Sequence, residues 1–306
     1  MTRAVRDRLE QELGVIEDLG FASYFLTVAE ASAMIGQMGV RHAARGSGVS
    51  SLVNYLLDVS QVDPLEHELL FERFLSNDRS TLPDIDIDVE SAERHRVYRR
   101  IFERFGPERV SLMSMQNAYR ARGAVRDAGL ALGIDPETVD GAAKQLWHLP
   151  ASALRETIAR QPELRDFAEQ VAQEKQLDLL VDLTERLDRL PRHISMHPCG
   201  VILGDLSLLD RTPVQSSGTG MPMSQFDKHD MDPMGMLKLD ILGVRMQSAL
   251  AHAVDEVART HPDRPRLDLE AIPVDDGRTF ELIRSTHTLG CFQIETGADQ
   301  PWRCSR

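Results

Sequence analysis

The chain has 306 residues, a formal net charge of -13 and a hydrophobic content of 42%. This length allows a core of ordinary size, and the acidic balance argues against a protein that grips nucleic acid through overall charge, because such affinity comes from neutralised phosphates. No apolar run approaches the roughly 20 residues that span a bilayer, and the N-terminus lacks the apolar centre of a signal peptide. The three widely spaced cysteines do not suggest a disulfide framework. We therefore expect a cytoplasmic protein with no membrane partner.

The first 80 residues predict mainly helices. Apolar residues recur at helical spacing over residues 4–35, with a break at Gly20, where a glycine is typical of a helix end. Residues 40–48 read as a loop of small residues. Ser50 then begins a short apolar helix that ends near residue 57. Another short helix is expected over residues 69–74.

The middle of the chain predicts strands that flank a helical segment. Residues 82–89 alternate strictly between apolar and acidic residues, which is typical of a strand. An arginine-rich helix follows and ends at Gly106, and residues 110–115 read as a strand. Residues 117–190 are helical and polar, which suggests a separate subdomain. Strand patterns return at 199–203 and 236–242, a helix is expected over 246–257, and the tail from Thr296 has no periodicity.

Charge is distributed unevenly along this sequence. Arginines gather between residues 94 and 126, at Arg94, Arg96, Arg99, Arg100, Arg104, Arg109, Arg120, Arg122 and Arg126. Such a run is either the solvated face of helices or a stripe that binds a nucleic-acid backbone. The sequence leaves both interpretations open.

The most informative residues are the aspartates of the 82–89 segment. Asp84, Asp86 and Asp88 are two apart and share one face of the predicted strand. Carboxylates packed so closely repel one another, and oxygen ligands of this kind suit Mg²⁺ or Mn²⁺. The alternative is a charged edge strand that faces solvent. Asp240 lies alone in the second apolar strand pattern and favours the metal hypothesis, because an unpaired buried aspartate is costly. Lys238, on the same face, either contacts a triphosphate or pairs with Asp240.

The segment Arg45, Gly46 and Ser47 is a second candidate site. Glycine permits close approach of the backbone to a ligand, and the following helix start presents amide groups to anions. Arg45 is suited to clamp a phosphate. A glycine-serine helix start, a strand with alternating aspartates and a later third carboxylate together resemble the polymerase-beta-like nucleotidyltransferases.

His193 and His197 are four residues apart and would suit zinc only on a helix. Pro198 and the apolar strand pattern after it argue against a helix there. A structural or substrate-contacting turn is the better interpretation.

The ordered motifs resemble those of the bacterial DNA polymerase III alpha subunit, a C-family DNA polymerase. The resemblance extends from about Leu9 to Glu295. It rests on GFASYFL (20–26), RGS (45–47), LLFERFL (69–75), LPDIDID (82–88), SQFD (224–227), LKLDILG (237–243) and GCFQIE (290–295). So many matches in one order are far more specific than any single motif.

This resemblance implies a role for each candidate residue. Asp84, Asp86 and Asp240 would be the catalytic carboxylates that hold two Mg²⁺ ions, or Mn²⁺, and Asp88 would be a neighbour. The incoming nucleotide's phosphates would contact Arg45, Gly46, Ser47 and Lys238. The reaction would be transfer of a nucleotide from a dNTP to a primer 3′-OH. Primer-template DNA, dNTP and other replicase subunits would be the partners.

The resemblance also implies a fold and a domain order. The fold would be α/β (α+β), a polymerase-beta-like palm sheet with an inserted helical thumb. The palm would comprise residues 1–116 and 191–245, and the thumb residues 117–190. Residues 246–306 would be the start of the fingers and an irregular tail.

Three departures from the family pattern keep alternatives open. Ala44 stands where the family usually has glycine before the arginine, and Gly48, Val49 and Ser50 replace its Ala-Ala-Gly run. The family's N-terminal phosphoesterase-type domain and most of its C-terminal parts are also absent from this sequence, which suggests a truncated chain. A remnant that binds metal, nucleotide or a partner protein without turnover is therefore the second hypothesis. A metal-dependent phosphohydrolase is the third.

Overall fold

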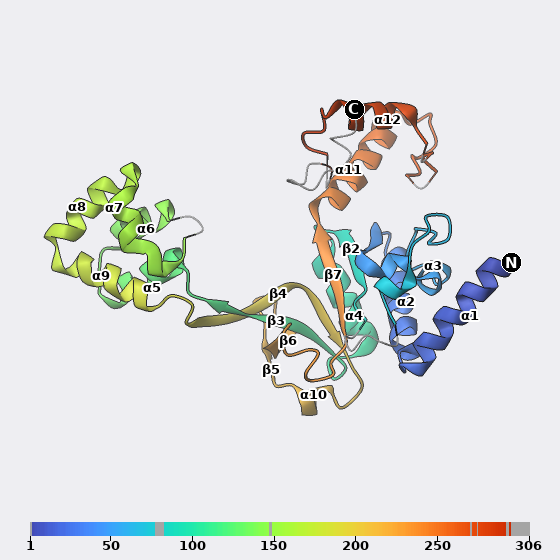
Figure 1. Ribbon diagram of the computed structural model, residues 1–306, viewed down its shortest axis with the longest axis horizontal. Helices are drawn as coiled ribbons and strands as arrows, with labels where there is room; N and C mark the ends of the chain where they lie inside the picture. Colours follow the sequence, from blue (N-terminus) through green and yellow to red (C-terminus); the bar gives the residue numbers. More distant parts are fainter. Residues whose placement is uncertain are drawn as a thin grey trace. The chain divides into compact units, whose positions relative to one another are not determined.

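A computed structural model describes residues 2–76, 83–146, 149–269, 271–273, 275–291 and 294. The described part is a mixed α/β protein with both parallel and antiparallel strand pairs, which confirms the predicted fold class at that level (Figure 1). The irregular tail predicted from Thr296 lies outside the described residues, as does Leu82 at the start of the predicted strand.

Helices and strands alternate irregularly along the described residues. The helices are α1 (Arg3–Asp18), α2 (Ala22–Gln37), α3 (Leu52–Leu56), α4 (Arg94–Phe105), α5 (Ala121–Ala131), α6 (Pro136–Gln145), α7 (Leu154–Arg160), α8 (Arg165–Gln173), α9 (Lys175–Arg186), α10 (Leu208–Arg211), α11 (Arg245–Thr260) and α12 (Gly277–Ser285). The strands are β1 (His42–Arg45), β2 (Asp86–Glu90), β3 (Val110–Ala118), β4 (Pro191–Leu203), β5 (Val214–Ser216), β6 (Pro222–Asp227) and β7 (Lys238–Val244).

The chain divides into two compact units. The first unit combines Met1–Gly106 with Leu237–Arg306, and the second unit is Pro107–Met236. The first unit is therefore built from two stretches of sequence, and the second unit is inserted between them.

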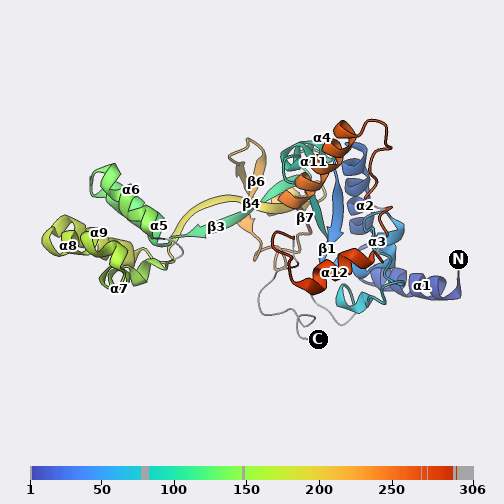
Figure 2. The same cartoon turned by 90° about the horizontal axis from the view of Figure 1, so that it is seen from above.

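Strands β1, β2 and β7 lie side by side, in that order, in the first unit. β1 is antiparallel to β2, and β2 is parallel to β7. Ile85, Ile87 and Val89 are each 0% exposed, because alternate residues of a strand share a face and this face lies in the core. Helix α2 lies alongside β1 (Figure 2). Its buried residues include Tyr24, Phe25 and Val28.

Two local differences from the sequence-based expectations affect the site. The predicted loop at 40–48 contains strand β1 and the start of a short 3-10 helix, Gly46–Ser50. The strand predicted from residue 82 begins at Asp86 instead. Pro83 has no N–H to donate, and the N–H of Ile85 donates to the Tyr24 hydroxyl at 3.3 Å rather than to a neighbouring strand.

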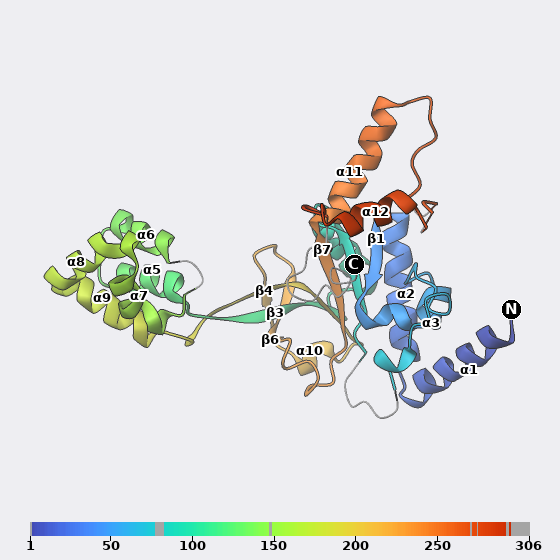
Figure 3. The same ribbon diagram turned by 45° about the horizontal axis from the view of Figure 1, so that its top comes forward.

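The second unit has its own strands and a helical cluster. Its strands run in the order β4, β3, β6, β5, and β3 and β4 form a long antiparallel pair (Figure 3). Both are longer than predicted, and β5 and β6 were not expected from the sequence. Helices α5 to α9 pack around an apolar core that includes Val125, Leu154 and Leu180. Asp135 caps α6 through the N–H of Thr138, at 2.9 Å.

No single helix of the described residues is long and apolar enough to cross a membrane. Only α1 and α2 taken together reach the required length and composition in that part of the chain, and they are bent by 112° at the break between them.

Candidate metal and nucleotide site

Asp84, Asp86 and Asp240 come together in the first unit. Asp86 and Asp240 are direct neighbours across the parallel β2–β7 pair, and Asp84 lies just before β2. One carboxylate oxygen from each residue lies within 4.8 Å of the other two. These three residues were predicted as metal ligands from distant parts of the sequence, and the parallel register accounts for their meeting.

Two cations lie among these carboxylates. The Lys238 Nζ atom is 2.7 Å from Asp84 Oδ1 and 2.6 Å from Asp240 Oδ2. Arg45 is in register with Asp86 across the β1–β2 pair, and its Nε atom is 3.2 Å from Asp88 Oδ1. Lys238 thus pairs with Asp240, as one of its two interpretations held, and with Asp84 in addition.

The positive charges of Lys238 and Arg45 do not fully offset the negative charges of the three converging carboxylates and Asp88. Burial raises the pKa of Asp86 to about 6, and the nearby charges of Asp84 and Asp240 add to the effect. Burial also raises the pKa of Asp88, against the opposing influence of Arg45. For Lys238, burial favours the neutral amine, but hydrogen bonds to Asp240 and Asp84 prevail and its pKa is raised. The site therefore retains an excess of negative charge.

The donor set fits a hard divalent cation. Asp240 Oδ1 is buried and has no hydrogen-bond partner among the described residues, which is costly for a carboxylate oxygen unless a cation binds there. The three converging ligands offer only oxygen atoms, the type that Mg²⁺ and Mn²⁺ prefer.

The predicted phosphate loop borders these carboxylates. Gly46 has a φ of 74°, and a Cβ atom added there would lie 3.2 Å from Asp86 Oδ2. Any side chain at this position would therefore combine an unfavourable backbone conformation with a close contact to the carboxylate. The main-chain oxygen of Ser47 accepts a hydrogen bond of 2.6 Å from the Ser50 hydroxyl, which fixes the following turn.

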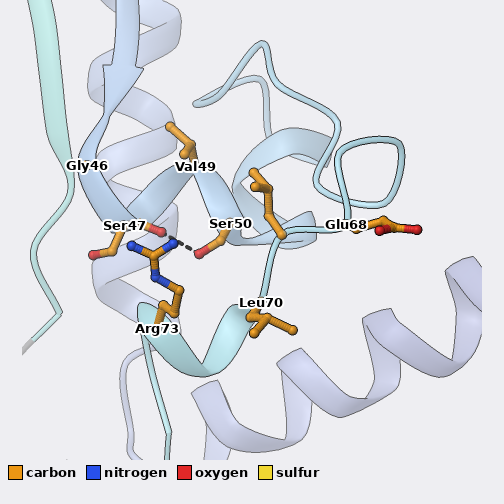
Figure 4. Close-up of a pocket in the computed structure, with 8 residues that line it drawn as sticks. Gly46, Ser47, Val49, Ser50, Glu68, Leu70 and Arg73 are labelled. Carbon is orange, nitrogen blue, oxygen red and sulfur yellow. Dashed lines mark hydrogen bonds between the residues drawn. The ribbon is translucent and has the colours of Figure 1, made fainter. Parts of the chain in front are cut away.

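A cavity of about 500 Å³ opens beside this loop (Figure 4). It is lined by Gly46, Ser47, Val49, Ser50, Glu68, Leu69, Leu70 and Arg73. The Arg73 guanidinium points toward the loop side of the cavity (Figure 4). Arg73 was assigned no role from the sequence, although it stands in the LLFERFL motif. The signal available was an arginine between two buried phenylalanines, Phe71 and Phe74.

The arginine run and the histidine pair stand apart from these carboxylates in the sequence. Several arginines of the run bind acids: Arg96 pairs with Glu93, Arg100 with Glu103, Arg104 with Glu30 and Arg126 with Asp140. These exposed pairs favour the interpretation of a solvated helix face. His193 and His197 lie within strand β4, so they do not have the helical spacing that a zinc pair requires.

Comparison with known proteins gives consistent matches along the chain. Residues 1–243 match the bacterial DNA polymerase III alpha NTPase domain, and residues 246–301 match the finger domain of the same subunit. An error-prone DNA polymerase of Symbiobacterium thermophilum is 37% identical over 301 residues, which cover 98% of this chain and 27% of that protein. Similar proteins of Burkholderia mallei and Pseudomonas aeruginosa, with the same name, are 37% and 36% identical, each over 96% of this chain and 28% of the relative.

The chain thus spans little more than a quarter of the length of these relatives. The alpha-subunit match alone extends over 243 residues of the 306. The chain belongs to the bacterial DNA polymerase III alpha family.

Proposed function

We propose that the first unit carries the nucleotidyl-transfer site of a DNA polymerase, which joins a dNTP to a primer 3′-OH and releases pyrophosphate. The observation that supports this most is the convergence of Asp84, Asp86 and Asp240, with a buried Asp240 oxygen that lacks a partner among the described residues. The family membership gives the reaction class, because the relatives are named as DNA polymerases.

In this proposal the three aspartates hold two Mg²⁺ ions, and Mn²⁺ can replace them. Such a pair of ions stabilises the attacking and leaving oxygens of a phosphoryl displacement. The chain's own contribution is to fix three oxygen ligands on adjacent strands before substrate arrives. Most of the rate enhancement then comes from positioning and from charge stabilisation.

Phosphate binding falls to the residues beside the carboxylates. An ammonium group has three N–H donors, and Lys238 uses two of them on Asp84 and Asp240. We assign the third donor to a phosphate oxygen of the dNTP. Gly46 and Ser47 offer backbone groups at the start of the 3-10 helix, and Arg45 and Arg73 add guanidinium groups that suit phosphate.

The wider organisation follows from the same assignment. Residues 1–116 and 191–245 would form the palm, residues 117–190 the thumb that holds primer-template DNA, and residues from 246 the start of the fingers. Other replicase subunits would bind a full-length polymerase of this family. Because the relatives described above are named error-prone DNA polymerases, we assign the chain to that branch rather than to the main replicase.

Mg²⁺-dependent primer extension tests the proposal. The purified chain is compared with an Asp84→Ala/Asp86→Ala variant, on a labelled primer-template with all four dNTPs. Extension by the chain and its loss in the variant are the expected results. Equal extension by both proteins would refute the assignment of the aspartates.

Two other outcomes point to the alternatives. Phosphate release from dNTP without primer would favour a phosphohydrolase. If neither protein extends the primer but metal binding needs the aspartates, the chain binds metal without turnover.

A further inference from the structure

The hydroxyl of Tyr24 lies between the two chain segments that carry the carboxylates. It donates a hydrogen bond of 3.0 Å to the main-chain oxygen of Lys238 and accepts one of 3.3 Å from the N–H of Ile85. Tyr24 is 4% exposed and Ile85 is 0% exposed. A buried hydroxyl therefore satisfies the N–H of a fully buried residue and the main-chain oxygen of a partly buried one.

The hydrogen-bonded bridge formed by the Tyr24 hydroxyl lies at the end of the β2–β7 strand pair. The β2–β7 ladder begins with the pair Asp86 and Asp240. Ile85 comes just before β2, and Lys238 is the first residue of β7. Beyond the ladder, the Tyr24 hydroxyl takes the place of direct hydrogen bonds between the two backbones. The hydroxyl thus ties the two segments to one another at this end of the strand pair.

The tied residues are close in sequence to the carboxylates. Ile85 stands between Asp84 and Asp86 in the sequence, and Lys238 is two residues before Asp240. A shift of either backbone segment therefore moves ligands of the proposed metal site. Groups that hold metal ligands in place from outside the coordination sphere commonly change metal affinity by about 10- to 100-fold when they are removed.

We infer that Tyr24 is a positioning residue whose hydroxyl sets the spacing between the Asp84–Asp86 segment and Asp240 for divalent-metal binding. This inference rests on the proposed function of the aspartates as metal ligands. The phenol does not itself contact the metal or the substrate. Burial strongly raises the pKa of the Tyr24 phenol, so that it remains protonated and keeps its donor.

The chain offers a matched control in Tyr98. This tyrosine is 0% exposed, and its hydroxyl donates to the main-chain oxygen of Ile241 on the same strand β7, at 3.2 Å. Tyr98→Phe and Tyr24→Phe each remove one buried hydroxyl that bonds β7. Only Tyr24 also bonds Ile85, so the two variants separate loss of a buried hydrogen bond from loss of the bridge.

The experiment titrates Mn²⁺ into the 306-residue chain and follows free Mn²⁺ by electron paramagnetic resonance. Wild type, Tyr24→Phe, Tyr98→Phe and Asp86→Asn are compared, and thermal unfolding without metal checks that all four are folded. We expect Tyr24→Phe to weaken Mn²⁺ binding by about tenfold. Tyr98→Phe should remain within about twofold of wild type in Mn²⁺ affinity, although it also loses a buried hydrogen bond and some thermal stability.

The two failures are distinguishable. Equal Mn²⁺ affinity in Tyr24→Phe and Tyr98→Phe would overturn the inference about Tyr24. If Asp86→Asn binds Mn²⁺ more weakly than wild type in the same experiment, the proposed metal site still stands. Wild-type affinity in Asp86→Asn would refute the metal site itself, and the role of Tyr24 with it.

Discussion

Aspartates of the two compact units have contrasting surroundings. In the second unit, Asp127 accepts hydrogen bonds of 2.8 and 2.9 Å from Arg192, which lower its pKa. Hydrogen bonds from Lys144 and Arg126 lower the pKa of Asp140 to about 2. In the first unit, burial and neighbouring carboxylates raise the pKa of Asp86 to about 6. Acids that have a structural role are matched with cations, whereas the acids of the candidate site retain a deficit of positive charge.

Burial alone does not mark the site. Glu12 is 0% exposed, but its carboxylate has partners. Arg8 Nε lies 2.7 Å from it and the Ser51 hydroxyl lies 2.8 Å from it. It also caps α3 through the N–H groups of Leu52 and Val53, at 3.0 and 3.1 Å. Asp240 is less buried but keeps an oxygen without a partner in the described part of the chain. This unmet hydrogen-bonding and charge requirement is the reason we assign Asp240 to the proposed metal site.

The largest expected effect on stability comes from the buried ion pair of the first unit. Glu12→Ala leaves the Arg8 Nε–H and two helix N–H groups without their acceptor, and should lower the free energy of unfolding by about 3 kcal/mol. Glu156→Ala breaks the exposed pair with Arg160 in the second unit and should cost less than about 0.5 kcal/mol. Urea unfolding measures both. Similar losses of unfolding free energy in the two variants would contradict the expected difference between the buried and the exposed ion pair.

Lys238→Met should have the next largest effect. It removes the cation between Asp84 and Asp240 and should lower the free energy of unfolding by about 2 kcal/mol without metal, because charged hydrogen bonds are lost. Saturating Mn²⁺ should restore part of this loss. Lys144→Met, which breaks an exposed pair with Asp140, should show neither effect. Thermal unfolding with and without Mn²⁺ checks this. If Mn²⁺ does not raise the stability of Lys238→Met, the result would contradict the proposed metal site.

The third prediction compares Gly46→Ala with Gly133→Ala, because the two glycines have similar backbone conformations. Gly46 and Gly133 have φ values of 74° and 67°, and a Cβ atom at Gly133 would meet nothing within 4 Å among the described residues. Each alanine should cost about 1 kcal/mol for its left-handed conformation. Only Gly46→Ala should also weaken Mn²⁺ binding, because its methyl group presses on Asp86. Unchanged Mn²⁺ affinity would show that the loop does not constrain the carboxylate.

The smallest effect is the pH dependence of the Asp127–Arg192 pair. Because the folded-state pKa of Asp127 is lowered, its stabilisation is present above the unfolded pKa of about 3.9 and is lost as pH falls through the lower folded value. Asp127→Asn should cost about 0.5 kcal/mol at pH 7, since the pair is partly exposed to solvent. The difference from wild type should vanish once the pH is below the folded-state pKa of Asp127. A difference that persists there would mean that the charge is not responsible.

The sequence predicted which carboxylates come together better than it predicted the side chains that hold their backbone segments in place. Alternation exposed Asp84 and Asp86, and the apolar run around Asp240 marked it as exceptional, because both patterns are local. Tyr24 and Arg8 were not recognised, because partners such as Ile85 for Tyr24 and Leu69 for Arg8 lie 61 residues away in the sequence. Such contacts leave no periodic trace in a single sequence.

The same reason accounts for the errors in the strands. β1 is only four residues long and is rich in alanine, so its pattern resembles a loop until β2 pairs with it. The start of β2 was placed too early because alternation continues through Asp84, whereas the Tyr24 hydroxyl takes the N–H of Ile85. Periodicity reports which face a residue occupies, but hydrogen-bond partners decide where a strand begins.

The most direct test of the account is Mn²⁺ binding to the chain and to two single variants. Asp240→Asn removes an acid of the candidate site, and Asp140→Asn removes an acid that Lys144 and Arg126 already neutralise. Isothermal titration calorimetry should show binding by wild type and Asp140→Asn and a loss of at least about 100-fold in affinity for Asp240→Asn. Equal binding by all three proteins would contradict the assignment of the unmatched carboxylates as a metal site.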